Sequence, residues 1–134
     1  MSIRAARQAT LCLLNVERRK HGLRPLRENR KLDRAAAGHS RAMVHHHYFD
    51  HGDFVGRIRR AGYSGFTLGE NIAWGSLQYS TPRSIVNMWM HSAGHRANIL
   101  RAKFTQIGIG IAPGAPERGV SDAATYTTDF GKPA

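Results

Sequence analysis

Apolar residues recur at helical spacing in the first half of the chain and predict two long helices. Residues 3–20 are dense in alanine and leucine, and Gly22 follows them with the conformational freedom that ends a helix. A second helix is predicted to begin near Asn29 and to run to about residue 47. Its inward face carries apolar residues and one histidine, namely Leu32, Ala36, His39 and Met43.

Capping residues mark two shorter helices. Asp53 can cap a helix over residues 53–61 that is closed by Gly62. Its inward face would hold Phe54, Ile58 and Ala61. Thr81 followed by Pro82 is the clearest helix start in the chain, because proline is favoured at the first helical position. That helix is expected to end before Gly94 and to bury Ile85, Met88 and Trp89.

The pattern changes to strict alternation in the last third of the chain. Isoleucines at 107, 109 and 111 alternate with Gly108 and Gly110, which predicts a strand whose second face admits another backbone closely. A second alternating run follows the turn-rich residues 113–122. We therefore predict an antiparallel pair formed by residues 105–112 and 123–130. Helices first and strands last indicate an α+β fold.

Length and cysteine content place limits on the architecture. A chain of 134 residues is the size of one ordinary domain, so residues 1–134 are expected to form a single domain with one core. The single cysteine, Cys12, lies in an apolar run and is predicted to be buried, and no disulfide can form within the chain. No segment is long enough to span a membrane, and the start of the chain lacks a signal-peptide core.

The chain is strongly basic. Twenty Lys and Arg against nine Asp and Glu give a net charge of +11, and sixteen of the twenty are arginine. Such a charge attracts acidic polymers such as nucleic acid, anionic cell-wall polymers or anionic membranes. The arginines are scattered, however, and no aromatic-rich nucleic-acid motif accompanies them. Two interpretations stay open, a generally basic solvated surface and a specific site for a polyanion.

Eight histidines are the chemical signal of this sequence, and six of them fall in two places, residues 45–51 and 91–95. The four-residue spacing of His91 and His95 is that of a zinc-protease helix, but the glutamate of that motif is missing and Gly94 lies between them. The run over residues 45–47 cannot direct three rings to one side of a helix. Neither group alone predicts a metal site.

A site assembled from three separate segments is the better hypothesis. His51 follows the second helix, Glu70 lies in a short extended piece, and His95 lies in the segment expected to join two helices. Two imidazoles and a carboxylate are a sufficient set for an open zinc site that water completes. The alternative is that the same three residues only tie loops together.

At these residues the chain resembles the bacterial branch of the CAP superfamily, whose other members include cysteine-rich secretory proteins, venom allergens and plant pathogenesis-related proteins. The resemblance covers roughly residues 10–131, and five motifs occur in the family's order and spacing. They are Phe49-x-His51, Gly69-Glu70-Asn71-Ile72-Ala73, Trp89-Met90-x-Ser92-x-Gly94-His95-Arg96-x-Asn98-Ile99-Leu100, Ile107-Gly108-Ile109-Gly110 and Asp129-Phe130-Gly131.

The resemblance implies a three-layer α-β-α sandwich with a central antiparallel sheet and a cleft that contains two histidines and two acids. By this resemblance the two histidines map to His51 and His95, which are expected to bind a divalent metal, zinc, and the first acid maps to Glu70. The second acid falls on Ser92, which leaves the site with a smaller carboxylate share. His91 departs from the bacterial pattern and is expected at the cleft rim.

Three classes of function follow. The family implies a secreted, monomeric binding module whose cleft holds a metal and a peptide, glycan or lipid. A metal-dependent hydrolase with Glu70 as base is the second, since zinc lowers the pKa of bound water to about 7. A Ser92 nucleophile served by His95 is a weaker variant of it, because no nucleophile elbow surrounds Ser92. Polyanion binding by the arginine surface is the third.

Overall fold

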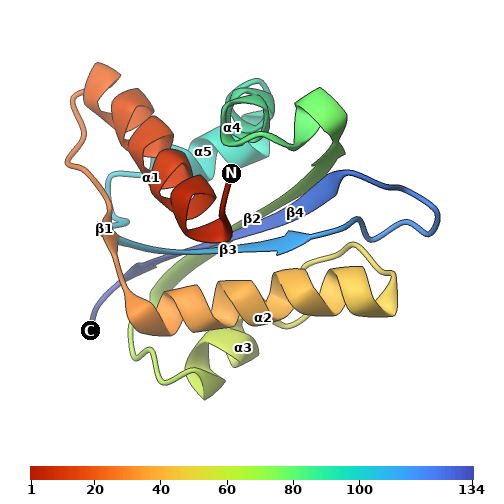
Figure 1. Cartoon of the computed structure of the whole chain (residues 1–134). Helices are drawn as coiled ribbons and strands as arrows, with labels where there is room; N and C mark the ends of the chain where they lie inside the picture. Colours follow the sequence, from red (N-terminus) through yellow and green to blue (C-terminus); the bar gives the residue numbers. More distant parts are fainter.

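The computed structural model describes residues 1–134 and has three layers (Figure 1). A four-stranded sheet lies in the middle, with α1, α4 and α5 on one face and α2 and α3 on the other. This is the predicted α-β-α arrangement. In chain order the elements are α1 (Ile3–Lys20), β1 (Arg27–Glu28), α2 (Arg30–His46), α3 (Phe54–Arg60), β2 (Thr67–Ser76), the 3₁₀ turn η1 (Leu77–Ser80), α4 (Pro82–Met90), α5 (Ala93–Ile99), β3 (Gln106–Pro113) and β4 (Ala123–Lys132).

The strand order in the sheet is β1-β3-β4-β2. The predicted antiparallel pair is confirmed as β3 and β4, with Ile109 opposite Thr128. β2 pairs with β4 along its whole length, also antiparallel, and places Glu70 opposite Asp129. The two-residue β1 is parallel to β3 and makes the sheet mixed at that edge. Because β2 lies at the other edge, its outer side is free to meet the helices above the sheet.

The predicted helix starts are confirmed by the caps. Asn29 Oδ1 accepts from the backbone N–H groups of Lys31 and Leu32 at 2.9 and 3.1 Å. The side chains of Asp53 and Thr81 accept in the same way from the first turns of α3 and α4. These bonds satisfy donors that the first turn of a helix otherwise leaves without a partner.

The second of the two helices that meet near His95 begins earlier than expected. The segment after α4, predicted to be a loop between them, is already the first turn of α5, which has Ser92 as its N-cap, begins at Ala93 and includes Gly94. Glycine costs a helix only about 1 kcal/mol relative to alanine. The burial of Ile99 against the core outweighs that cost, so His95 lies on a helix and not in a loop.

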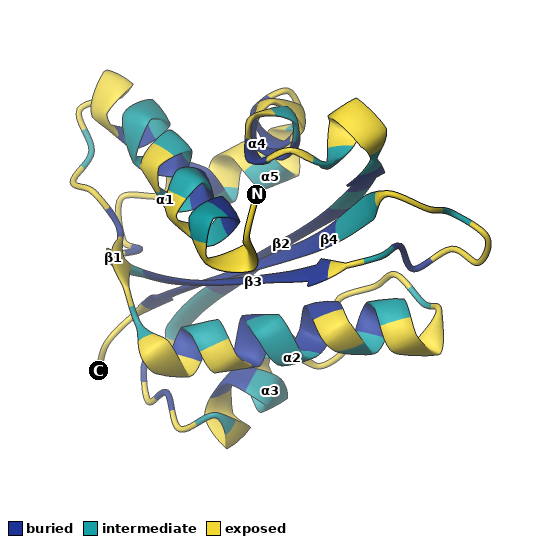
Figure 2. Ribbon diagram, viewed as in Figure 1, coloured by how far each residue is buried: buried dark blue, intermediate teal, exposed yellow.

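The main core lies between the sheet and α1, α4 and α5 (Figure 2). Trp89 packs there with Ile85 and the isoleucines of β3, as predicted. Met88 was predicted to join them, but it is 45% exposed and Val86 is buried in its place. The buried stripe of α4 is therefore rotated toward the Val86 and Met90 side.

The prediction that Cys12 is buried was wrong, since it is exposed. The buried residues of α1 are Ala6, Thr10, Leu14 and Arg18, four residues apart. Cys12 lies midway between two of them in sequence and hence on the opposite face of the helix. An apolar run in the sequence does not decide which of its members face the core.

The two glycines of β3 let α2 lie directly on the sheet. A Cβ atom added at Gly108 would lie 1.9 Å from the backbone carbon of Leu32, and one added at Gly110 would lie 2.1 Å from the backbone nitrogen of Ala37. Real Cβ atoms cannot approach backbone so closely. The predicted close approach of a second backbone is thus confirmed, and the second backbone is α2.

Asp33 of α2 forms a hydrogen bond to β3 beside these two glycines. Its Oδ1 accepts from the N–H of Ile109 at 2.9 Å. Burial, together with a hydrogen bond to the neighbouring Glu28 carboxyl, raises the pKa of Asp33 to about 7. Near neutral pH the two carboxyls therefore share a proton, which Asp33 donates to Glu28.

We predict that Asp33→Asn removes a pH dependence of stability. The folded chain holds the Asp33 proton up to about pH 7, whereas the unfolded chain releases it near pH 4, so unfolding becomes easier as the pH rises through that window. Asparagine can keep both hydrogen bonds without a charge. Urea denaturation should give equal stability at pH 4 and a variant more stable by about 1 to 2 kcal/mol at pH 8. Equal stability at both pH values would contradict this assignment.

Candidate functional site

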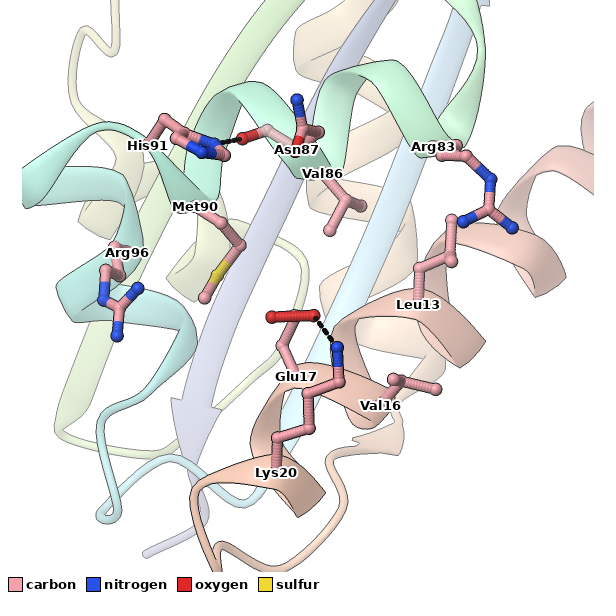
Figure 3. Close-up of a pocket in the computed structure, with 10 residues that line it drawn as sticks. All are labelled: Leu13, Val16, Glu17, Lys20, Arg83, Val86, Asn87, Met90, His91 and Arg96. Atoms are coloured by element: carbon pink, nitrogen blue, oxygen red, sulfur yellow. Dashed lines mark hydrogen bonds and ion pairs between the residues drawn. The ribbon is translucent and has the colours of Figure 1, made fainter.

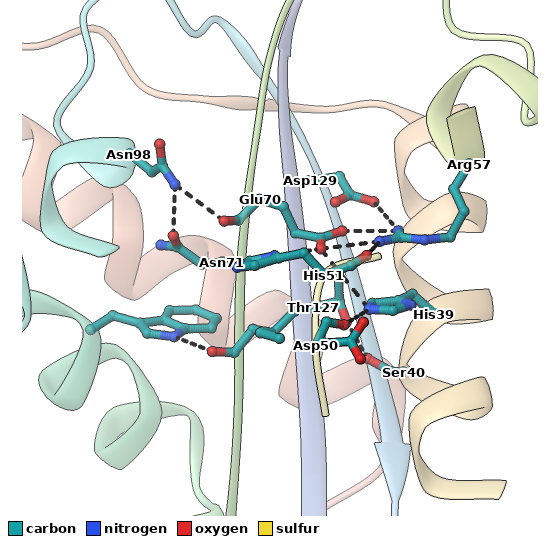
Figure 4. Close-up of polar contacts among 12 residues, drawn as sticks. His39, Ser40, Asp50, His51, Arg57, Glu70, Asn71, Asn98, Thr127 and Asp129 are labelled. Carbon is teal, nitrogen blue, oxygen red and sulfur yellow. Dashed lines mark hydrogen bonds and ion pairs between the residues drawn. The ribbon is translucent and has the colours of Figure 1, made fainter. Parts of the chain in front are cut away.

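The carboxylate of Glu70 is the centre of a polar network between the sheet and α3 (Figure 4). Its side chain is fully buried on β2. Oε1 accepts from His51 Nδ1 at 2.8 Å and from Arg57 Nη2 at 3.1 Å, and Oε2 accepts from Arg57 Nη1 at 2.9 Å. The predicted contact between Glu70 and His51 is therefore present. Arg57 forms a bidentate ion pair with the Glu70 carboxylate and neutralises its charge.

Hydrogen bonds from the side chains of Arg57 and His39 hold the loop that carries His51. Arg57 Nη2 donates to the carbonyl oxygen of His51, and His39 Nε2 donates to the carbonyl oxygen of Asp50 at 2.8 Å. Burial, together with the positive charge of Arg57, lowers the pKa of His39. His39 is thus neutral and serves as a hydrogen-bond donor. The loop is fixed while the His51 ring stays 46% exposed.

A second buried carboxyl, Asp129, faces Glu70 from β4. Its side chain is fully buried, and neither of its oxygens accepts a hydrogen bond from an N–H or hydroxyl group. Burial raises the pKa of Asp129 well above its usual value, and the hydrogen bond to Glu70 and the Glu70 charge raise it further. Asp129 is therefore protonated at neutral pH and donates its proton to Glu70.

Glu70 itself stays ionised. Burial raises its pKa, but the hydrogen bonds from Asp129, Arg57 and His51 outweigh burial and leave the pKa below its usual value. The two carboxyls together carry one negative charge, and the Arg57 guanidinium, 4.0 Å from Asp129 Oδ2, balances it. The network is electrically neutral without any charge on His51.

His95 lies on α5, on the face of the sheet opposite α3 and Arg57. Its Nδ1 is 2.8 Å from Ser92 Oγ, and its backbone carbonyl accepts from Asn71 Nδ2 at 3.0 Å. The ring packs near Trp89, with ring centroids 6.3 Å apart. Burial lowers the pKa of His95, and the neighbouring His51 lowers it further. His95 is hence neutral at pH 7.

Side chains from α4 and α5 cover the free edge of β2. Asn98 Nδ2 donates to the carbonyl oxygen of Glu70 at 3.2 Å and to Asn71 Oδ1 at 2.9 Å. Trp89 Nε1 donates to the carbonyl oxygen of Ile72 at 3.2 Å. These bonds fix the two helices against the strand and so set the position of His95 relative to Glu70.

The three residues predicted from separate segments thus meet at the same edge of the sheet. Glu70 bonds to His51 directly, and His95 is held to β2 through Asn71. No group of three or more His, Cys, Asp or Glu side chains surrounds a single point as metal ligands would. Glu70 stands behind the His51 ring, in the position from which a carboxylate orients a histidine ligand.

The two other predicted cleft residues, Ser92 and His91, lie in different parts of the structure. Ser92 bonds to His95, as described above. His91 lies in a pocket of about 430 Å³ between α1 and α4, where its Nδ1 is 2.7 Å from the carbonyl oxygen of Asn87 (Figure 3). Neither His51, Glu70 nor His95 lines that pocket. His91 is therefore at the rim of a separate pocket.

Sequence reasoning missed Arg57 and Asp129 and placed His39 only in the core. Arg57 was one of sixteen scattered arginines, and nothing in its spacing marks it. Asp129 did belong to a motif, and its partner follows from the pairing of β2 with β4. The sequence alone does not give that register, so it did not show that Asp129 lies opposite Glu70.

Comparison with known proteins agrees with this architecture. Residues 11–128 match the family described as CAP, cysteine-rich secretory protein family. The uncharacterized protein YkwD of Bacillus subtilis is 40% identical over 114 residues, which are 81% of this chain and 43% of YkwD. The chain thus spans less than half of that relative.

Solved structures share the fold. An extracellular protein of Bacillus anthracis that contains an SCP domain superposes with a TM-score of 0.80 at 29% identity, over 96% of this chain and 41% of that one. NaASP2, in a structure with Zn²⁺, gives a TM-score of 0.69 at 15% identity, over 99% of this chain and 85% of NaASP2. No helix of the present structure has the length and hydrophobicity needed to cross a membrane.

Proposed function

The chain belongs to the CAP family of cysteine-rich secretory proteins, and on that premise we propose that it is an extracellular binding domain whose cleft holds a divalent metal, zinc, through His51 and His95. The extracellular location follows the description of the Bacillus anthracis relative. The family supports zinc through NaASP2, whose structure was determined with that ion.

One observation carries the proposal. In both histidines Nδ1 already has a partner, Glu70 Oε1 for His51 and Ser92 Oγ for His95. A carboxylate only accepts, so the proton of His51 lies on Nδ1 and the lone pair of Nε2 is free. Ser92 can accept from His95 Nδ1 in the same way. Histidine ligands in zinc sites typically donate their other ring N–H to such a partner.

The remaining residues prepare the two imidazoles. Arg57 and His39 hold the loop of His51, and Asn71 holds the turn of His95. The lowered pKa of His95 keeps it neutral at pH 7, as a ligand must be. A bound zinc ion would offer its open positions to a carboxylate, phosphate or carbonyl oxygen of a cleft ligand.

Glu70 is a poor candidate for the general base of a hydrolase. Both of its oxygens are engaged by Arg57 and His51, and its side chain is fully buried. A base must reach the proton that it removes. The Ser92 variant lacks an orienting acid, since His95 Nδ1 bonds to Ser92 itself. The geometry thus favours binding over hydrolysis.

We predict that His51→Ala and His95→Ala each abolish zinc binding measured by calorimetry on protein purified without chelators or a nickel column. Each variant removes one of the two ligands, whereas the fold should persist because neither ring belongs to the core. His46→Ala, in the exposed run at the end of α2, is the control and should bind like the parent chain. Affinity should fall as the pH drops below about 6.5, where histidine becomes charged.

The histidine run is the alternative site. If zinc binding survived in the His51→Ala/His95→Ala double variant and vanished when residues 45–47 were replaced, the cleft assignment would be wrong. A chain that binds no zinc at pH 7.5 would likewise overturn the metal proposal.

A further inference from the structure

Three arginines line one small pocket between α2 and α3, on the face of the sheet opposite α1. The pocket has a volume of about 280 Å³. Arg34 comes from α2, and Arg57 and Arg60 come from α3. The rest of the lining is small or neutral, namely Ala35, Gly38, His39 and Ala61.

Arg57 is paired with Glu70, but the other two positive charges of this pocket have no ion-pair partner. Neither Arg34 nor Arg60 forms an ion pair with a carboxylate, and no acidic residue lines the pocket. Arg34 uses one N–H, from Nη2, to donate to the carbonyl oxygen of Ala61 at 3.1 Å. A guanidinium has five N–H donors, so most of those on Arg34 remain available. Two adjacent unpaired cations make an anion the favoured occupant.

The shape of the pocket selects a compact ligand. Its lining residues Ala35, Gly38 and Ala61 present little apolar surface, and a Cβ added at Gly38 would have nothing within 4 Å. No long apolar side chain lines the pocket to hold a hydrocarbon chain. The planar donors of arginine match the oxygens of phosphate in pairs, which lysine does not do.

Arg57 connects this pocket to the network of Glu70. Its guanidinium lines the pocket and also bonds to Glu70 and to the carbonyl oxygen of His51. We propose that the pocket of Arg34, Arg57 and Arg60 is an oxyanion site that binds a phosphate group, either free or as part of a phosphodiester polymer. Because Arg57 is shared, occupancy should also be felt at His51.

The test measures the binding of inorganic phosphate to the full chain. Phosphate is titrated into the protein at low ionic strength, and binding is followed by NMR. Arg34→Gln/Arg60→Gln removes the two unpaired cations and should weaken phosphate binding at least tenfold. The matched control is Arg4→Gln/Arg19→Gln, which removes two exposed arginines from α1 and lowers the net charge equally. The control should change affinity less than twofold, and in the parent chain the His51 ring signals should shift as phosphate binds.

A second variant keeps every charge. Gly38→Leu should fill the pocket without disturbing α2, because the added side chain points into open space. It should lose phosphate binding while its thermal unfolding occurs at or above that of the parent chain, because leucine is favoured over glycine inside a helix. This variant keeps the test decisive even if the arginine pair proves to be needed for folding.

The source of the phosphate is distinguished by two more probes. A poly(glycerol phosphate) oligomer that binds more tightly than phosphate, with the same loss in Gly38→Leu, would indicate a polymer ligand. Phosphatidylglycerol vesicles that bind equally well to Gly38→Leu would show only a general attraction to the basic surface. Equal weakening of phosphate binding by both arginine pairs, or no saturable phosphate binding, would overturn the proposal. Zinc binding is read separately, so either proposal can fail alone.

Discussion

Replacing Arg57 with methionine should lower the free energy of unfolding by about 3 to 5 kcal/mol, as expected when one partner of a buried ion pair is removed. Methionine keeps much of the side-chain volume but leaves the Glu70 carboxylate buried with no cation. The loss should be measured by urea denaturation at pH 7. Arg60→Met, on the same helix but exposed and unpaired, is the control and should stay within about 0.5 kcal/mol.

A second substitution isolates the charge. Arg57→Met/Glu70→Gln removes both members of the pair, so it should recover part of the stability lost in the single variant. The Arg57→Met deficit should also shrink as the pH falls, because the Glu70 whose pKa Arg57 depresses is then protonated. A deficit below about 1 kcal/mol at pH 7 would show that water reaches Glu70 and that the network is not buried.

Trp89→Ala should cost a similar amount, about 3 to 5 kcal/mol, through loss of a fully buried ring. The substitution also removes the hydrogen bond from Nε1 to the carbonyl of Ile72. Met88→Ala, one residue earlier and half-exposed, should cost less than about 1 kcal/mol. Trp89→Phe keeps most of the ring and loses the donor, so an intermediate value is expected. A loss for Trp89→Ala equal to that for Met88→Ala would contradict the burial of this face.

The parts of the fold that were predictable are those controlled by local chemistry. Asn29, Asp53 and Thr81 cap helices because their side chains compete for nearby N–H groups, and this needs no knowledge of the rest of the chain. Gly108 and Gly110 predicted a close backbone, and α2 lies there. Such signals can be found in a few consecutive residues.

The errors occurred where the phase or register of an element decides the result. Met88 and Val86 are both apolar, and only the packing of α4 on the sheet determines which one is buried. Cys12 was misplaced for the same reason. The site shows the same limit, since His51, Glu70 and His95 were found through the family motifs, whereas the role of Asp129 needed the pairing of β2 with β4.

The way Asn98 and Trp89 cover the outer carbonyls of β2 also bears on self-association. A strand at the border of a sheet is a template on which a second chain can add a strand, and this is a common route to aggregates. Here the carbonyls of Glu70 and Ile72 already have donors from α4 and α5. Local detachment of those two helices would uncover the template while most of the chain stayed folded. Variants that loosen α4 should therefore precipitate at temperatures below their unfolding transition.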